Sequence, residues 1–182
     1  SIIINNTDKI TLTNIIEHGA SVRKGIKNSL LVIDMPKGSY NNPKQAKKNA
    51  QLIKKKTNCD AVKIESNSRN FHIIRELVKS KISVMGHIGF TPQFKKKFKV
   101  EGNNKKETKK LINEAQLIEN AGAFAIVLEC IDPTATQSIT EILKIPTIGI
   151  GSSSYCDGQI LVTDDLLGLS GFYPKFIKKY AK

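Results

Sequence analysis

Residues 60–65 read Asp-Ala-Val-Lys-Ile-Glu, a short apolar segment that carries a cation and a carboxylate two residues apart. Because side chains alternate between the two faces of a β-strand, this segment predicts a strand with Lys63 and Glu65 on one face. Burying an isolated charge costs on the order of several kcal/mol, so we expect both side chains to meet other charged groups. The simpler alternative is a Lys–Glu pair at a solvated strand end.

The flanking sequence alternates between apolar runs and amphipathic segments. Apolar runs at 29–35, 82–85, 124–128 and 146–150 predict further buried strands, and one more is expected within 157–162. Apolar residues at helical spacing predict helices over 13–25, 43–56, 71–78, 111–121 and 133–143, with Thr13 as a plausible N-cap of the first. The polar, lysine-rich residues 93–106 are long for a plain connection, which favours a lid or binding loop.

Strands that alternate with helices predict a parallel sheet, because parallel neighbours need a crossover helix. About six such units occur, and no GxGxxG or GxxxxGK[ST] loop favours an open nucleotide-binding sheet, so we expect a (β/α)₈ TIM barrel. A closed barrel of this kind needs about 250 residues, whereas the chain has 182 and begins with Ser1. We therefore expect a single domain over 1–182 with about six of eight strands, lacking the two N-terminal ones.

The charge balance raises nucleic-acid binding as a rival function. The formal net charge is +13, from 29 Lys and Arg against 16 Asp and Glu. Arginine, which reads phosphates and bases by its forked donors, is scarce, and the lysines are spread along a chain rich in Ile and Asn. We therefore expect no nucleic-acid partner.

Cysteine usage and hydropathy indicate the compartment. Cys59, Cys130 and Cys156 lie far apart without a CxxC pair, which argues against a disulfide framework and a zinc site. No run is long and apolar enough to span a membrane, and no basic-then-apolar leader is present. We expect a soluble cytoplasmic protein that does not bind a membrane.

Polar residues stand at the ends of four successive predicted strands. Asp34 ends the first, Lys63 and Glu65 the second, His87 follows the third and Glu129 ends the fourth. Each has a simpler explanation as a helix cap, a surface pair or a satisfied core histidine. Because the carboxyl ends of barrel strands carry the active site, their recurrence at equivalent positions favours a common site.

These residue types favour metal-assisted enolate chemistry. The carboxylates Asp34 and Glu65, without a supporting His/Cys cluster, suit a hard cation such as Mg²⁺. Lys63 beside them suits the carboxylate of a substrate. Glu129 could serve as a general base.

Several motifs carry a resemblance to a known family. They are 34–40 (DMPKGSY), 62–65 (VKIE), 86–93 (GHIGFTPQ), 128–130 (LEC), 149–151 (GIG) and 156–162 (CDGQILV). In this order they resemble the ketopantoate hydroxymethyltransferase (3-methyl-2-oxobutanoate hydroxymethyltransferase) family of pantothenate biosynthesis, over residues 8–182.

The resemblance implies a Mg²⁺-dependent barrel of the phosphoenolpyruvate/pyruvate type. Such an enzyme transfers a hydroxymethyl group from 5,10-methylenetetrahydrofolate to 3-methyl-2-oxobutanoate, giving 2-dehydropantoate through a Mg-stabilised enolate. By position, Asp34 and Glu65 would be metal-linked, Asp34 and Lys63 would contact the keto acid, and Glu129 would accept the proton. His87 would orient this network without a chemical step. The family also implies a homo-oligomer, a decamer.

Departures from the family pattern leave alternatives open. The family has two earlier strands, the second ending in a Gly-Asp-Ser motif that also holds metal and substrate, and this chain shows neither. The alternatives are an inactive truncated remnant and another Mg-dependent carbon–carbon bond enzyme on the same barrel. A further hypothesis is that the lysines of the long loop, at 95, 96, 97 and 99, attract the anionic tail of folate.

Overall fold

The computed structural model describes residues 10–66, 68, 70–95, 97–169 and 176. Its centre is a six-stranded parallel sheet in which the strands lie side by side in chain order. The strands are β1 (Val32–Asp34), β2 (Ala61–Glu65), β3 (Val84–Gly89), β4 (Ala125–Glu129), β5 (Thr147–Ile150) and β6 (Gly158–Gln159). A sheet in which each successive strand adds to the same edge is typical of a (β/α) barrel, whereas a doubly wound open sheet adds strands at both edges.

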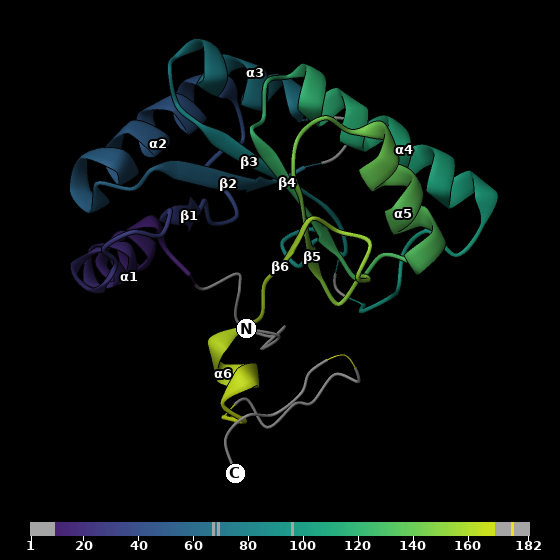
Figure 1. Cartoon of the computed structure of the whole chain (residues 1–182). Coiled ribbons are helices and arrows are strands. Elements are labelled where there is room, and N and C mark those ends of the chain that lie inside the picture. Colours follow the sequence, from purple (N-terminus) through teal and green to yellow (C-terminus); the bar gives the residue numbers. More distant parts are fainter. Residues whose placement is uncertain (1–9, 67, 69, 96, 170–175, 177–182) are drawn as a thin grey trace.

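The helices of the described residues are α1 (Leu12–Gly25), α2 (Pro43–Thr57), α3 (Phe71–Lys79), α4 (Lys105–Asn120), α5 (Pro133–Ile142) and α6 (Thr163–Leu166). Helices α2 to α5 connect the strands from β1 to β5, while α1 precedes β1 and α6 follows β6. Figure 1 shows α2, α3, α4 and α5 as an arc along the outside of the strands. The predicted incomplete barrel is therefore confirmed as a half-barrel of six parallel strands.

The core lies between the outer face of the strands and the helices. Alternate residues of the central strands, such as Ile64, Ile88 and Leu128, are at most 1% exposed and belong to one cluster with helix residues such as Leu77 and Ile118. Each buried aliphatic side chain contributes about 1.5–3 kcal/mol. The residues between them in each strand, Lys63 among them, consequently face the interior of the half-barrel.

Gly86 of β3 lies close against a helix that covers the sheet. A Cβ atom at this position would collide with the Ile118 side chain of α4. We expect Gly86→Ala to lower the free energy of unfolding by about 1–3 kcal/mol, because the helix must shift to admit a methyl group. Urea denaturation measures the change. Gly25→Ala, where a Cβ atom meets nothing within 4 Å, is the matched control, and an equal effect of both substitutions would refute the packing explanation.

Some predicted boundaries differ from the structure. The first strand begins at Val32 and not at residue 29, the third runs to Gly89, and only Gly158–Gln159 of the expected last strand pairs. The N-cap of α1 is Thr11, whose hydroxyl accepts the N–H of Asn14 while the Asn14 side chain accepts the N–H of Thr11. This reciprocal capping box satisfies two amide donors, which is why the helix begins before Thr13.

Among the helices within the described residues, none is both long and apolar enough to cross a membrane.

Candidate functional site

Strand register brings the predicted site residues to one rim of the half-barrel. Asp34, the last residue of β1, pairs in register with Lys63 of β2. Glu65, the last residue of β2, is in register with His87 of β3, and Glu129 ends β4. These positions alternate with the outer core residues, so their side chains share the interior face.

A continuous chain of polar contacts joins four of these side chains. The Lys63 Nζ atom lies 2.6 Å from Asp34 Oδ1 and 3.1 Å from His87 Nδ1. On the other side of the ring, His87 Nε2 lies 3.2 Å from Glu129 Oε2 and 3.0 Å from the carbonyl oxygen of Phe90. One network therefore crosses β1 to β4, with the imidazole at its centre.

The contacts of His87 decide its tautomer. The Lys63 ammonium can only donate, so Nδ1 of His87 accepts, and Nε2 carries the hydrogen that points toward Glu129 and Phe90. Burial, followed by the charge of Lys63, lowers the pKa of His87. Burial acts to lower the pKa of Lys63 as well, but Asp34 and the other carboxylates outweigh it and raise that pKa. The pair is thus a lysine cation and a neutral histidine.

Solvent exposure is lowest at the centre of the network and highest at Asp34. The Asp34 side chain is 53% exposed, those of Lys63 and Glu129 are each 15% exposed, and that of His87 is 2% exposed. The network is therefore most exposed at Asp34 of β1, and its side chains become more buried toward His87. Lys63 and Glu129 both keep part of their side-chain surface exposed.

Glu65 is the most perturbed carboxyl group at this rim. It is 5% exposed, and its Oε2 atom accepts the backbone N–H of Gln93 at 3.0 Å. Burial raises the pKa of Glu65 to about 7; Lys63 and the Gln93 N–H oppose this, while Asp34 and Glu129 add to it. A cation beside Glu65 would favour its ionised form.

The rim offers a two-carboxylate site for a divalent cation. Within the described part of the chain, no three His, Cys, Asp or Glu side chains gather as a metal site. Magnesium commonly takes only one or two protein carboxylates and completes its shell with water and substrate oxygens. Asp34 and Glu65 are oxygen donors at the ends of neighbouring strands, and the pKa of the buried Glu65 stays raised in spite of the nearby Lys63 charge, so a further cation would be favoured beside it and these residues fit Mg²⁺.

The perturbed Glu65 predicts a pH-dependent stability. The pKa of Glu65 rises from 4.5 to about 7 on folding. The contribution of Glu65 to the free energy of unfolding is therefore fully present below pH 4.5 and is lost as pH rises through 7. We expect the metal-free protein to lose up to about 3 kcal/mol relative to Glu65→Gln between pH 4.5 and 8. Urea denaturation of both proteins at several pH values measures this difference. Parallel stability profiles would contradict the prediction.

Gln93 and Tyr40 belong to the site, although residue-level reasoning assigned them no role. The Gln93 side chain donates from Nε2 to the carbonyl oxygen of Met35 at 3.0 Å and accepts the Tyr40 hydroxyl at 2.6 Å. Both residues stand in the motifs quoted above, GHIGFTPQ and DMPKGSY. The motifs were the available signal, but no spacing rule predicted the contact between them.

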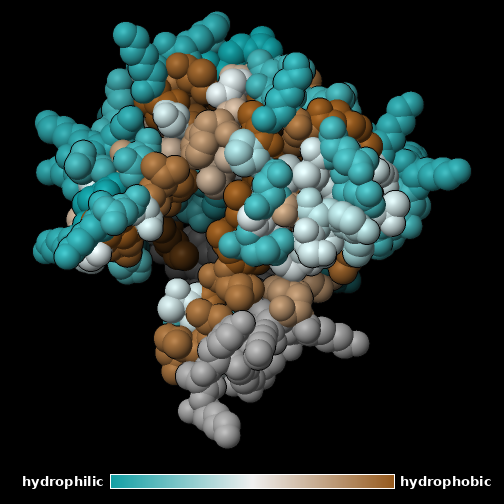
Figure 2. All heavy atoms as spheres, in the orientation of Figure 1, coloured by the Kyte–Doolittle hydropathy of each residue, from teal (hydrophilic) through white to brown (hydrophobic). Residues whose placement is uncertain are grey.

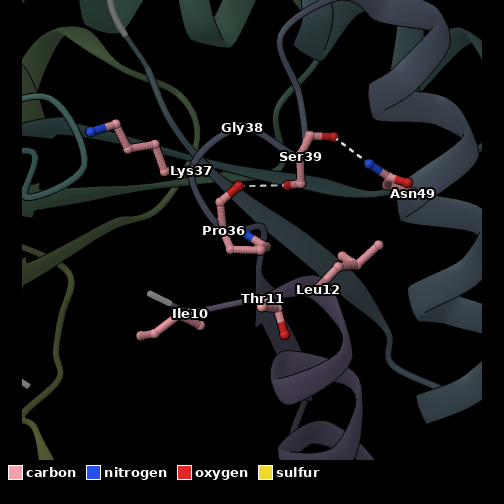
Figure 3. A pocket seen from close by; sticks show the side chains of 8 residues that line it. All are labelled: Ile10, Thr11, Leu12, Pro36, Lys37, Gly38, Ser39 and Asn49. Carbon is pink, nitrogen blue, oxygen red and sulfur yellow. Dashed lines mark hydrogen bonds between the residues drawn. The ribbon is translucent and has the colours of Figure 1, made fainter. Parts of the chain in front are cut away.

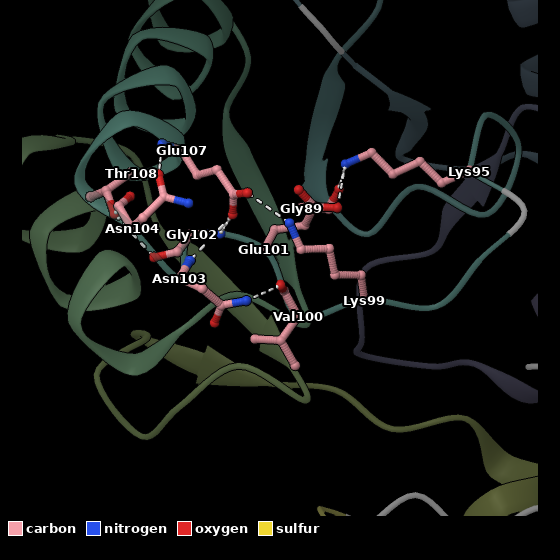
Figure 4. Close-up of polar contacts among 10 residues, drawn as sticks. All are labelled: Gly89, Lys95, Lys99, Val100, Glu101, Gly102, Asn103, Asn104, Glu107 and Thr108. Atoms are coloured by element: carbon pink, nitrogen blue, oxygen red, sulfur yellow. Dashed lines mark hydrogen bonds and ion pairs between the residues drawn. The ribbon is translucent and has the colours of Figure 1, made fainter.

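The loop after β3 is held by its own ion pairs (Figure 4). Lys95 Nζ donates to the carbonyl oxygen of Gly89 at 2.8 Å and pairs with Glu101 at 2.9 Å. Lys99 pairs with Glu107 at 2.6 Å, at the start of α4. Two of the lysines expected to attract folate thus already have carboxylate partners, and Lys96 lies outside the described residues. These ion pairs hold the loop in its conformation, and the charges of Lys95 and Lys99 are partly neutralised by their carboxylate partners.

A separate hollow of about 340 Å³ lies beside the β1–α2 loop (Figure 3). Its lining residues are Ile10, Thr11, Leu12, Pro36, Lys37, Gly38, Ser39 and Asn49, and none of the predicted site residues is among them. The Ser39 hydroxyl donates to the Pro36 carbonyl oxygen at 2.6 Å, and the Asn49 side chain donates to the Ser39 carbonyl oxygen at 2.7 Å. These bonds fix the loop that carries Met35 to the rim.

Comparison with known proteins identifies related sequences. The family model described as ketopantoate hydroxymethyltransferase matches residues 3–182. A 3-methyl-2-oxobutanoate hydroxymethyltransferase from Pelagibacter ubique (strain HTCC1062) is 48% identical over 176 residues, which is 97% of this chain and 68% of the relative. One from Clostridium botulinum (strain Alaska E43 / Type E3) is 46% identical over 181 residues, 97% of this chain and 66% of the relative. The chain thus spans about two thirds of the length of these relatives.

Solved structures with little sequence identity share the fold. A Burkholderia cenocepacia J2315 protein, provisionally named a phosphonomutase, has a TM-score of 0.62 at 9% identity, covering 83% of this chain and 70% of that one. A 2,3-dimethylmalate lyase of the PEP mutase/isocitrate lyase superfamily has a TM-score of 0.57 at 13% identity, covering 77% of this chain and 51% of that one. At such identities the likeness concerns the half-barrel alone.

Proposed function

The chain belongs to the ketopantoate hydroxymethyltransferase family, and from this premise we propose that the protein transfers a hydroxymethyl group from 5,10-methylenetetrahydrofolate to 3-methyl-2-oxobutanoate, giving 2-dehydropantoate. The observation that carries the proposal is the network from Asp34 through Lys63 and His87 to Glu129, with Glu65 beside it. It combines an anion-binding cation, two oxygen donors for a metal and a carboxylate base within one rim.

Lys63 and Asp34 are proposed to hold the keto acid. The Lys63 ammonium has three hydrogens, and among the described residues Asp34 and His87 take two of them. The third can bind the carboxylate of a keto acid, a charge-assisted contact that is stronger than a neutral hydrogen bond. Asp34 at the open end would then face the keto acid from β1.

Glu129 is proposed to remove the C3 hydrogen of the keto acid. The C3–H bond breaks, its proton passes to a Glu129 carboxylate oxygen, and the electron pair remains on the substrate as an enolate. The enolate carbon then forms a bond to the methylene carbon of the folate as one carbon–nitrogen bond of that carbon breaks. A water oxygen replaces the second nitrogen and becomes the hydroxyl group, and tetrahydrofolate leaves with the C3 proton and a proton of the water on its two nitrogens. His87 orients the base, because its Nε2–H points at Glu129 Oε2.

Asp34 and Glu65 would hold magnesium. When bound, Mg²⁺ supplies Lewis acidity at the 2-oxo group and lowers the cost of removing the adjacent proton. Glu65 suits this position because its burial makes the ionised form unfavourable without a neighbouring cation. The remaining partners proposed here are the two small substrates and further copies of the chain in a homo-oligomer.

The test of the proposal is product formation. The chain is assayed alone and joined to the part of the Pelagibacter ubique relative that it does not cover, with both substrates and Mg²⁺, and 2-dehydropantoate is measured by mass spectrometry. We expect Mg²⁺-dependent product from the joined protein. No product from the joined protein, in spite of cooperative folding, would favour the inactive remnant. The structural neighbours show a common fold alone and give no reason to prefer another carbon–carbon bond reaction.

A further inference from the structure

Gln93 connects three segments of the rim through three separate hydrogen bonds. Its backbone N–H donates to Glu65 Oε2 at 3.0 Å. Its side-chain Nε2 donates to the Met35 carbonyl oxygen at 3.0 Å, and its Oε1 accepts the Tyr40 hydroxyl at 2.6 Å. The loop after β3 is thereby tied to the loop after β1 and to the end of β2.

The two side-chain hydrogen bonds of Gln93, to Met35 and to Tyr40, are called the clasp below, and they require an amide side chain. One end of the side chain must donate to a carbonyl and the other must accept from a hydroxyl, which an amide does and a carboxylate does not. The Met35 contact spans 58 positions of the chain and the Glu65 contact spans 28, so both depend on tertiary structure. Removing the amide would release the loop that presents the backbone N–H to Glu65.

Tyr40 is a suitable partner for this clasp. It is 4% exposed, and burial, followed by the charges of Glu65 and Asp34, raises its pKa above its ordinary range. The phenol consequently remains protonated and donates its hydrogen. Through Gln93, the Tyr40 hydroxyl is linked to Glu65, one of the residues proposed to hold the metal.

We propose that Gln93 is a positioning residue: its side chain anchors the β3–α4 loop on Met35 and Tyr40, and its backbone N–H thereby holds the Glu65 carboxylate toward a divalent cation and the keto acid. The inference rests on the proposed function for the identity of the ligands. Gln93 itself contacts neither the metal nor the reacting atoms. Its effect should therefore be seen in ligand affinity and loop protection more than in the chemical step.

The test uses Tyr40→Phe, Gln93→Met and the double variant in the joined protein. Keto-acid binding is measured by calorimetry across Mg²⁺ concentrations, and exchange of the Gln93 amide hydrogen is followed by NMR. We expect Tyr40→Phe to raise the half-saturating Mg²⁺ concentration about tenfold, which corresponds to the loss of one hydrogen bond, and Gln93→Met, which removes both side-chain hydrogen bonds, to raise it at least as much. The double variant should be no worse than Gln93→Met, because that substitution already removes the bond to Tyr40. Amide exchange at Gln93 should become at least about tenfold faster.

Matched controls separate positioning from general destabilisation. Tyr155→Phe removes the hydroxyl of a tyrosine that is 51% exposed. It should change neither the half-saturating Mg²⁺ concentration nor the exchange rate of the Gln93 amide hydrogen. Gln93→Glu keeps an acceptor for the Tyr40 hydroxyl but loses the donor to the Met35 carbonyl oxygen, so exchange of the amide hydrogen at position 93 should become faster, as in Gln93→Met.

Two results would overturn the inference: wild-type Mg²⁺ dependence in Tyr40→Phe and Gln93→Met, or additive effects in the double variant. A lowered melting temperature with unchanged Mg²⁺ dependence would reduce Gln93 to a structural residue. If the wild-type protein itself binds no keto acid, the proposed function fails, and unaltered exchange of the Gln93 amide in Tyr40→Phe would then reject the clasp as well.

Discussion

Glu129→Gln should reduce the formation of 2-dehydropantoate by about 10³-fold, within the range that general bases contribute. The glutamine has nearly the shape of the glutamate, and its carbonyl oxygen can still accept the Nε2–H of His87, which now contacts Glu129 Oε2. It cannot take a proton from carbon. We therefore expect keto-acid affinity within about threefold of wild type, as measured by calorimetry, alongside the loss of turnover.

Glu76→Gln provides the control for this substitution. Glu76 lies on α3 with an exposed side chain and pairs with Lys79, so its neutralisation should leave turnover unchanged. Wild-type turnover in Glu129→Gln would remove Glu129 from the role of base. A loss of turnover accompanied by an equal loss of keto-acid affinity would instead assign Glu129 to binding.

Lys63→Met should weaken keto-acid binding by about 10- to 100-fold, because charge-assisted hydrogen bonds contribute about 1.5–3 kcal/mol. Methionine fills the space of the lysine stem and removes the cation. Asp34 loses its partner, but its side chain is 53% exposed and can be solvated instead. The buried Nδ1 atom of His87 also loses its donor, so we expect the free energy of unfolding to fall by about 1–3 kcal/mol, and the loss of binding should appear in the dissociation constant measured by calorimetry.

Lys79→Met is the corresponding control, since Lys79 is exposed and pairs only with a neighbour on its own helix among the described residues. It should leave keto-acid binding at the wild-type level. Lys63→Arg should not restore wild-type affinity, because the larger planar guanidinium cannot occupy the same position between Asp34 and His87. Unchanged affinity in Lys63→Met would show that the keto acid binds elsewhere.

Period-two patterns were sufficient to predict which residues face the interior. Val62 and Ile64 alternate with Lys63 and Glu65, and the observed strand has the same alternation about the sheet. The prediction of a common rim followed from the rule that parallel strands bring their carboxyl ends together. Local sequence could not show that His87 lies between Lys63 and Glu129, because this contact depends on strand register and side-chain rotamers.

The contacts within the loop after β3 could not be predicted from the sequence for a related reason. Lys95 pairs with Glu101 and Lys99 with Glu107, at spacings of six and eight residues that no helical rule predicts. An excess of lysines suggested an anion site, whereas the folded loop uses two of them internally. Gln93 likewise acquires its contacts only when loops distant in sequence meet at the rim.

Exchange of the C3 hydrogen of 3-methyl-2-oxobutanoate in D₂O, followed by proton NMR without any folate, isolates proton removal from group transfer. We predict exchange by the joined protein that requires Mg²⁺, is abolished by a chelator and is lost in Glu129→Gln. Protein that binds the keto acid but exchanges no C3 hydrogen, or undiminished exchange in Glu129→Gln, would contradict enolate formation at this rim.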